Sequence, residues 1–390
     1  MNNEIICFAC LTEFHLFVSY ILSTTIYYQK KKILLICKNF RLAKYIDSLL
    51  ELNIWDELII IDPFDPLEEI ISRLIKLSDS IDILHFFSWG FSPYNKLFVQ
   101  CISKDKKVIL TDEGSASYLP FKWFNSWIDN YDSNRSIVGE VDLKKASEIW
   151  LFNPLLFRDQ KIIPIRKIDL VNFYKSCNEN FHVVEDFKKI FKFDENKLFN
   201  YDLIYFRQYY SLRGDLTINA DSFIDNQICS ILESNNFYIK DHPAYLINPF
   251  KQKNDSLFTL DIPWEAFIVL SKIDNSKKIN MPKVYISSSS SAMFNTNAFG
   301  IFGEFIFLNH IFELYTDIKD NNINELIIAS KQIYPNSKFY EPKDWDELQK
   351  IISNIAKENK LYQPKVSILQ LYKEECKWLR EQYLNQRRKN

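Results

Sequence analysis

The chain has 390 residues, of which 47% are hydrophobic and 16% are aromatic. A single hydrophobic core rarely extends over so long a chain, so the length predicts two domains of about 200 residues each. Lys and Arg number 48 against 50 Asp and Glu, so the net charge of -2 gives no reason to expect nucleic acid as a partner. The high aromatic content is typical of an ordered globular protein and argues against a disordered chain.

The seven cysteines are odd in number and scattered through apolar runs, which is typical of reduced core cysteines and not of a disulfide framework. Cys7 and Cys10 have a Cys-x-x-Cys spacing without a second pair, which favours buried packing over a redox or zinc site. The pair Asp344 and Asp346 precedes a helical pattern, where a helix cap is favoured over a metal site. No metal is therefore assigned.

Glu4 stands before the first apolar run, and no basic start or small-residue cleavage site accompanies it, so this run predicts a first strand and not a signal peptide. The sequence holds no stretch of about 18 uncharged apolar residues. A cytoplasmic protein is expected. The basic end, Arg387 to Lys389, fits either a peripheral contact with the inner membrane or a solvated tail.

Short apolar runs rich in Ile, Val, Leu and Phe alternate with longer amphipathic stretches, a pattern that predicts buried parallel strands joined by helices. The first half of the chain is expected to contain six strands: Ile5–Cys10, Ile33–Cys37, Glu57–Ile61, Ile83–Phe87, Lys107–Thr111 and Glu148–Phe152. The second half is expected to contain five: Leu203–Arg207, Phe237–Lys240, Ala266–Leu270, Val284–Ser287 and Phe305–Leu308.

A charged segment at about 175 to 200 predicts the connection between two domains, 1–180 and 181–363, and 364–390 is expected to be an amphipathic helix with a basic tail. Only six glycines occur, and no Gly-x-Gly-x-x-Gly or Gly-Lys-Ser/Thr sequence is present. The sequence motifs of dinucleotide-dependent oxidoreductases and of P-loop phosphotransferases are therefore absent. The predicted fold class is α/β of the GT-B type, with two Rossmann-like domains whose parallel sheets face a central cleft.

Asp112, Glu113 and Gly114 directly follow an expected strand, which would hold two carboxylates and a flexible turn at its carboxyl end. Ligands of such sheets bind at this end, so either carboxylate is a candidate catalytic base. The alternative is a solvated turn in which Asp112 caps the next helix.

His242 and Pro243 follow another expected strand, where the histidine is a candidate donor to a leaving phosphate and the proline would begin a helix. A packed or surface histidine is the alternative. The run that contains Ser289, Ser290 and Ser291 also ends a strand, and its hydroxyls and amides would form an anion site at a helix N-terminus. Serine runs are also common in plain loops.

Three further side chains are candidate ligand contacts. The carboxylate of Glu265 precedes an apolar run and could accept hydrogen bonds from both hydroxyls of a ribose. Trp89 follows a strand of the first half, and Trp123 lies in an aromatic segment after the acidic pair. Both tryptophans could stack on acceptor sugars, whereas a packed hydrophobic loop is the alternative.

The acidic pair with glycine, the His-Pro pair and the serine run, in this order, resemble the bacterial sialyltransferases: glycosyltransferase family 52, the polysialyltransferases and family 80. Asp112-Glu113-Gly114-Ser115 is similar to the Asp-Asp-Gly-Ser of family 80. The start, Ile5 to Thr12, looks like the first strand and turn of family 52. These motifs span about 1 to 300.

The resemblance implies an inverting, metal-independent transfer of sialic acid from CMP-sialic acid to a glycan or lipid-linked glycan of the capsule or lipooligosaccharide. It implies that Asp112 or Glu113 is the base, although a family 52 member suggests an aspartate such as Asp215 or Asp221 instead. His242, beside Pro243, would donate to the phosphate. Ser289, Ser290 and Ser291 would hold the phosphate and Glu265 the ribose.

Two other functions remain open at this point. One is a GT-B transferase with another activated donor, such as a UDP-sugar or CDP-glycerol, because serines and a histidine at strand ends would serve those phosphates too. The other is a non-catalytic glycan-assembly protein that keeps the fold. The nucleotide that the protein binds distinguishes the first alternative from a sialyltransferase. Substitution of Asp112 or His242 distinguishes the second, because it should stop turnover in a transferase and leave the function of a non-catalytic protein unchanged.

Overall fold

The computed structural model describes residues 4–38, 41–62, 64–87, 98–99, 101–118, 146–157, 163–192, 201–208, 218–232, 237–242, 262–273, 281–315 and 321–359, and the observations below concern these residues. The chain divides into two compact units. Unit 1 comprises Met1–Phe193 with Ile262–Asn275, and unit 2 comprises Asp194–Asp261 with Ser276–Asn390. The chain therefore leaves unit 1 at Phe193 and returns to it for one short stretch.

Unit 1 contains a seven-stranded sheet of order β3-β2-β1-β4-β5-β6-β7 in which every neighbouring pair is parallel. Its strands are β1 (Ile5–Cys10), β2 (Lys31–Cys37), β3 (Glu57–Ile61), β4 (Ile83–Phe86), β5 (Lys107–Thr111), β6 (Ala146–Leu151) and β7 (Ile165–Lys167). The central strands are nearly continuous apolar runs because helices cover both faces of a parallel sheet.

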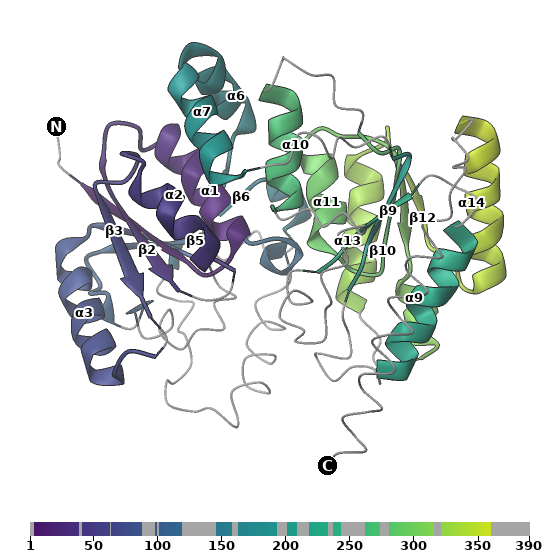
Figure 1. The fold of residues 1–390 in the computed structure, drawn as a ribbon, viewed down its shortest axis with the longest axis horizontal. Helices are drawn as coiled ribbons and strands as arrows, with labels where there is room; N and C mark the ends of the chain where they lie inside the picture. The colour runs from purple at the N-terminus through teal and green to yellow at the C-terminus, as the bar shows by residue number, and fades with distance from the viewer. Residues whose placement is uncertain are drawn as a thin grey trace. The chain divides into compact units, whose positions relative to one another are not determined.

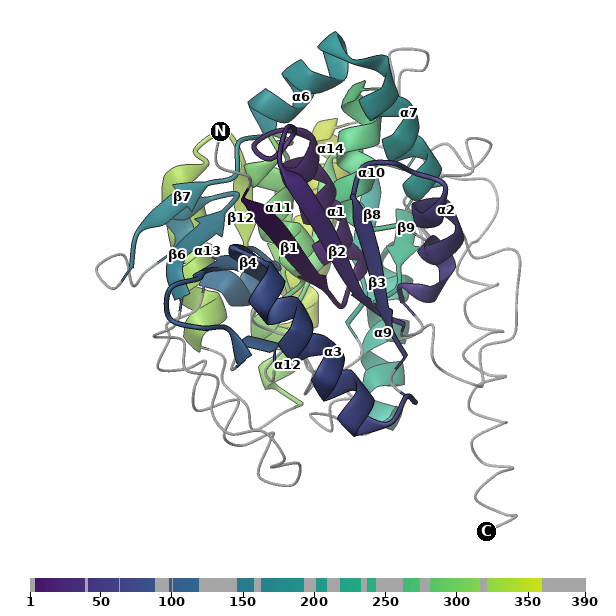
Figure 2. The same ribbon diagram turned by 90° about the vertical axis from the view of Figure 1, so that its left-hand side faces the viewer.

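The described helices of unit 1 are α1 (Glu13–Thr24), α2 (Ile46–Leu50), α3 (Leu67–Ser80), α6 (Leu170–Glu179), α7 (Phe181–Ile190) and α10 (Trp264–Ile273). Figures 1 and 2 show α3 on the opposite face of the sheet from α1 and α2. Helix α3 buries Ile70, Leu74 and Leu77 at helical spacing, whereas α1 is buried over almost its whole length. Helix α1 therefore lies deep in the unit, directly after the central strand β1.

Unit 2 contains a five-stranded parallel sheet of order β12-β11-β10-β8-β9. Its strands are β8 (Leu203–Phe206), β9 (Phe237–Lys240), β10 (Val284–Ser287), β11 (Glu304–Phe307) and β12 (Lys338–Tyr340). Its described helices are α9 (Ile218–Leu232), α11 (Ser291–Ala298), α12 (Asn309–Glu313), α13 (Asn321–Ile333) and α14 (Trp345–Asn359).

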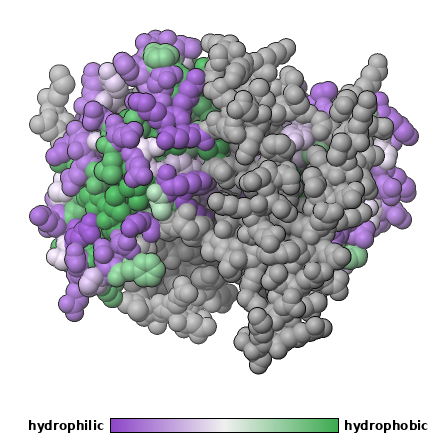
Figure 3. Space-filling model, viewed as in Figure 1, coloured by the Kyte–Doolittle hydropathy of each residue, from purple (hydrophilic) through white to green (hydrophobic). Residues whose placement is uncertain are grey.

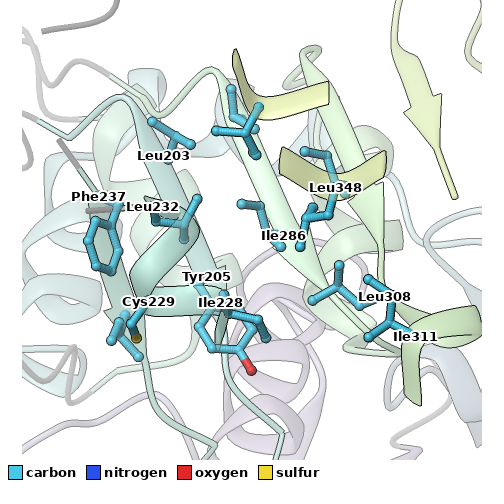
Figure 4. Close-up of a cluster of buried hydrophobic side chains, with 14 of the residues drawn as sticks. Leu203, Tyr205, Ile228, Cys229, Leu232, Phe237, Ile286, Leu308, Ile311 and Leu348 are labelled. Carbon is cyan, nitrogen blue, oxygen red and sulfur yellow. The ribbon is translucent and has the colours of Figure 1, made fainter. Parts of the chain in front are cut away.

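One hydrophobic cluster joins the sheet of unit 2 to the helices α9 and α14 (Figure 4). Leu203 and Tyr205 of β8 contribute to it together with Ile228 of α9 and Leu348 of α14, all of them at most 1% exposed. Each fully buried aliphatic side chain of this kind contributes roughly 1.5–3 kcal/mol to folding. The cluster thus holds β8 and its neighbours in register.

The structure confirms the predicted fold class, an α/β chain with two Rossmann-like units built on parallel sheets. Ten of the eleven expected strands are present, with bounds that differ by a few residues at most. The expected strand Ala266–Leu270 is wrong, because these residues form the middle of α10. Two three-residue strands, β7 and β12, were not expected.

The charged segment at about 175 to 200 is not a linker where the structure describes it. Residues up to 190 form α6 and α7, and Val183, Phe187 and Ile190 of α7 are buried in unit 1. The charged residues lie on the outer faces of these helices, which is why the segment looks polar in sequence. The contacts change from unit 1 to unit 2 at Phe193, not at 180, and the expected helix in 364–390 lies outside the described residues.

Hydrophilic side chains make up most of the described surface of unit 1 seen in Figure 3, with an area of hydrophobic side chains among them. Exposed apolar side chains of this unit include Leu50, Phe64 and Leu67. In the described part of the chain, every helix is too short or too polar to cross a bilayer.

Candidate functional site

The strand order of each sheet fixes where a ligand can bind. In unit 1 the order reverses between β1 and β4, and in unit 2 it reverses between β8 and β10. In open parallel sheets, ligands bind outside the carboxyl ends of the strands at such a switch point, because the connections leave it in opposite directions. The candidate residues are therefore found among the first residues after these strands and their neighbours.

Asp112 follows β5 in unit 1 and is fully buried. Three donors converge on its carboxylate: the Gly114 N–H at 2.8 Å from Oδ1, the Phe152 N–H at 3.0 Å from Oδ2, and the Tyr118 hydroxyl. The Tyr118 hydroxyl oxygen in turn accepts the Asn153 N–H at 3.2 Å. Asp112 thus joins the turn after β5 to the end of β6.

The buried environment of Asp112 makes ionisation of its carboxyl group less favourable than in water. Burial raises the pKa of Asp112 to about 6, the three hydrogen bonds lower it in part, and the negative charge of Glu265 raises it again. Oδ1 accepts the N–H of Gly114, which precedes the short helix Ser115–Tyr118, so this bond holds the turn and does not cap that helix. Asp112 is also buried, so its part of the turn is not solvated. Gly114 has φ 114°, a conformation that few residues other than glycine adopt.

Glu113 turns away from this network toward helix α1. Its Oε2 lies 3.4 Å from Nε2 of His15, and the two side chains are each 2% exposed. The Glu113 N–H donates to Ser117 Oγ at 2.9 Å, which holds the backbone of the turn. Sequence reasoning missed His15, which lies in the first turn of α1 after the central strand β1.

Both the ring and the backbone of His15 are held by neighbouring groups. Its Nδ1 accepts the Leu11 N–H at 3.2 Å, and its ring stacks on Phe87 with centroids 4.2 Å apart and an interplanar angle of 8°. The hydroxyl of Thr12 caps α1 by accepting the His15 N–H at 3.2 Å. Burial lowers the pKa of His15 well below its ordinary value, and the positive charge of Arg41 lowers it further. The imidazole is therefore neutral at neutral pH.

Glu265 lies in the first turn of α10 and is 6% exposed. The stretch Ile262–Asn275 belongs to unit 1, and the charge of Glu265 acts on Asp112 in the same unit. Sequence order had grouped Glu265 with the serine run, whereas its contacts group it with the acidic pair. Its expected role toward a ribose stays a prediction.

The serine run of unit 2 forms the turn between β10 and α11. Ser287 Oγ donates to the Phe206 carbonyl at 2.8 Å, which joins the ends of β10 and β8 across the switch point. The hydroxyl of Ser290 caps α11 by accepting the Ala292 N–H at 3.4 Å. Ser289, Ser290 and Ser291 are half-buried at this helix N-terminus, so the predicted arrangement of hydroxyls and amides is present.

Arg207, which sequence reasoning missed, follows β8 at the same switch point and is 6% exposed. Its Nε lies 2.6 Å from Asp225 of α9, and its Nη1 lies 3.3 Å from Asp241. Asp241 and the half-buried His242 follow the neighbouring strand β9. Arg207 thus holds Asp241, the residue before His242, in place. Asp225 and Asp241 lie far from Arg207 along the chain, so the sequence did not indicate these ion pairs.

Several predicted residues lie outside the described residues: Pro243, Trp89, Trp123 and Asp215. Asp221 lies in α9, but its side chain is also outside the description. Asp344 Oδ1 accepts the Glu347 N–H at 2.8 Å at the start of α14, which confirms its interpretation as a helix cap. Where side chains are described, no three histidine, cysteine or acidic residues are grouped as metal ligands.

No protein-family profile matches the chain, and no curated protein matches it in sequence. Among solved structures it is similar to the UDP-GlcNAc 2-epimerase from Neisseria meningitidis bound to UDP-GlcNAc, with 10% identity, 92% of each chain covered and a TM-score of 0.47. It is also similar to a glycosyltransferase from Rickettsia africae, with 12% identity, 98% of this chain and 97% of that chain covered and a TM-score of 0.41.

A third similar structure is MurG from Acinetobacter baumannii, with 10% identity, 97% of this chain and 95% of that chain covered and a TM-score of 0.43. Similarity at this level carries no information on activity. The function must therefore be inferred from the residues of this chain.

Proposed function

We propose that the chain is a metal-independent glycosyltransferase that transfers sialic acid from CMP-sialic acid to a hydroxyl of a glycan acceptor. One observation carries the proposal: the two units hold complementary groups at their switch points and after the strands next to them. Unit 1 holds carboxylates and a neutral histidine, whereas unit 2 holds hydroxyls, a helix N-terminus and a second histidine. Transfer of a sugar needs both a base for the acceptor and stabilisation of the leaving phosphate.

The groups of unit 2 suit the leaving phosphate. The free amides at the start of α11 and the hydroxyls of Ser290 and Ser291 favour an anion there, because the helix dipole is positive at this end. His242 follows the strand β9 and would donate to a phosphate oxygen as the bond to the sugar breaks. Arg207 and its two aspartates keep the backbone at this strand end in place.

Of the two carboxylates in unit 1, Glu113 suits the base better than Asp112. Both oxygens of Asp112 are already acceptors for the hydrogen bonds that hold the turn. Glu113 takes the acceptor's proton, and the acceptor oxygen bonds to the anomeric carbon. The bond from that carbon to the phosphate oxygen breaks, and its electron pair leaves with CMP. Because the side chain of Glu113 is 2% exposed, neighbouring atoms must move before an acceptor can reach its carboxylate.

The chemistry of the leaving group favours CMP as the nucleotide. CMP leaves with a single phosphate, which hydroxyls, amides and one histidine can stabilise without a metal ion. The order of the three motifs, Asp112 to Gly114, His242 with Pro243 and Ser289 to Ser291, supports the same donor. A UDP-sugar or CDP-glycerol is the main alternative donor.

Calorimetric titration of the purified protein with CMP, UDP and CDP, with and without EDTA, tests the proposal. We expect CMP to bind most tightly, EDTA to have no effect, and His242→Ala to weaken CMP binding by about tenfold or more. His182→Ala is the matched control, because His182 is exposed on α7 of unit 1 and should leave the affinity unchanged. Tighter binding of UDP or CDP, or no nucleotide binding, would contradict the proposed donor.

A further inference from the structure

A histidine in the first turn of α1 serves Glu113 in a way that the sequence motifs do not indicate. The hydrogen bond from Leu11 to His15 fixes which ring nitrogen carries the proton. Because Nδ1 accepts the Leu11 N–H, it has no proton in the neutral ring, and the proton must lie on Nε2. Nε2 faces Glu113 Oε2 at 3.4 Å. The ring therefore presents an N–H to the carboxylate.

We infer that His15 is the positioning residue for Glu113: its Nε2–H donates to Glu113 Oε2, and the fixed ring holds the carboxylate at the switch point of unit 1. The inference rests on the proposed function, which gives Glu113 the role of base. His15 does not itself take the acceptor's proton, since both of its nitrogens are occupied. The stack on Phe87 restrains its ring, and the hydrogen bond to Thr12 at the cap of α1 restrains its backbone.

The donor and the carboxylate reinforce one another because both are removed from water. Each side chain is 2% exposed, so water competes little with a hydrogen bond between them. A neutral donor stabilises the ionised carboxylate without forming a tight ion pair, and the carboxylate therefore remains able to accept a proton. Because His15 contacts the base and not the substrate, its loss should change kcat more than KM.

The test compares three variants by the pH profile of CMP release from CMP-sialic acid, with water as the acceptor. His15→Phe keeps a ring on Phe87 but has no donor, and we expect its acidic limb to move up by about one pH unit. Its kcat at pH 7 should fall about tenfold or more with little change in KM. His15→Gln keeps an amide donor at a similar position and should recover much of the rate.

His85→Phe is the matched control for the loss of a buried histidine. His85 is also fully buried in unit 1 and stacks on Phe8. Its two ring nitrogens form hydrogen bonds with the hydroxyls of Thr111 at 2.9 Å and Tyr27 at 2.8 Å, and not with Glu113. We expect this variant to lose stability while its acidic limb stays in place. Equal pH profiles for the His15→Phe variant and the wild type, or equal shifts in both Phe variants, would overturn the inference.

The other charged groups around the pair are the same in all three variants, so they cannot produce a difference between them. Asp112 adjoins Glu113 in the turn, Glu265 acts on Asp112, and Arg41 acts on His15 with Glu13 beside it. A shift that appears only in the His15→Phe variant therefore reports the lost Nε2–H.

A spectroscopic readout separates this inference from the proposed function. In long-range 1H–15N spectra of protein labelled at its five histidines, His15 should remain neutral with its proton on Nε2 from pH 5.5 to 8. Glu113→Gln should shift the Nε2–H resonance. Titration of His15 in this range, or a proton on Nδ1, would overturn the pairing. A wild-type protein that releases no CMP, with the tautomer as stated, would instead overturn the proposed donor and leave the pairing intact.

Discussion

Asp112 is a carboxyl group that folding removes entirely from water, and its protonation is therefore linked to stability. Its folded pKa of about 6 lies above the ordinary value of 3.8, so the folded state binds a proton more tightly than the unfolded state does. The stability from this group is fully present below about pH 4 and is lost as the pH rises to about 6. The loss is about 3 kcal/mol at most.

Asp112→Asn should abolish this decline, because an amide does not ionise. At pH 4 the variant should be less stable than the wild type by about 1–3 kcal/mol, because its amide NH2 would face one of the donors at Gly114, Phe152 or Tyr118. Urea denaturation at several pH values between 4 and 7 measures both effects.

The control for Asp112→Asn is Asp169→Asn at the N-cap of α6. Asp169 accepts the Val171 N–H at 2.9 Å on the surface, and asparagine caps helices equally well. This variant should follow the wild type at every pH. If Asp112→Asn shows the same decline between pH 4 and 6 as the wild type, another group is responsible for it.

Individual residues of the site differ in how well the sequence predicts them. Asp112 and Glu113 could be found because they directly follow an apolar strand, and the serine run could be found in the same way. His15 could not, because it lies 98 positions before Glu113 and only the fold brings the start of α1 beside the turn after β5. The one local signal is Thr12, a helix-capping residue three positions earlier.

At the scale of elements, two helices of unit 2 allow a direct test of the anion site. Ser290 caps α11 and Asp344 caps α14, each through its side-chain oxygen. Ser290→Ala and Asp344→Ala should each lower stability by about 1 kcal/mol. Only Ser290→Ala should weaken CMP binding, by about tenfold, because α14 has no part in the proposed site. Thermal denaturation and calorimetry on both variants measure the two effects.

Equal CMP affinities in the two variants would show that the cap of α11 is structural only. Equal losses of affinity would show that the weaker binding follows from lower stability and not from the lost hydroxyl. The pair thus separates the two roles that a serine at a helix N-terminus can have.

The elements themselves could be predicted unevenly, for physical reasons. Strands at the centre of each sheet are apolar on both faces and stand out in the sequence, whereas β7 and β12 are three-residue edge strands that contain no buried residue. Residues Ala266–Leu270 were mistaken for a strand because a short, fully buried apolar run has no periodicity that separates strand from helix. The buried environment of α10 is a tertiary property that the local sequence does not show.

At the scale of the whole molecule, α10 makes unit 1 discontinuous in sequence. Ala266, Phe267, Ile268 and Val269 are fully buried, and Lys272 lies 5.6 Å from the ring centre of Tyr174 in α6. A fragment that ends at Phe193 therefore lacks part of its own core.

We expect the fragment of residues 1–193 to bind a hydrophobic dye and to unfold without a cooperative transition. The same fragment with residues 262–275 joined to it by a flexible linker should bind less dye and recover a cooperative transition, because it restores the buried face of α10. Dye fluorescence and near-ultraviolet circular dichroism on both fragments measure this. A cooperative transition in the shorter fragment would contradict the assignment of α10 to unit 1.

The position of α10 in the chain also sets an order of events on the ribosome. Unit 1 begins with residues that are made first, but its last helix is made only after 68 residues of unit 2, Asp194–Asp261. At about 5–20 residues per second, synthesis of residues 194–275 takes roughly 4–16 s. During that delay the surface that later receives α10 is open to water. Unit 1 therefore cannot complete its fold until the ribosome has synthesised a segment from the second half of the chain.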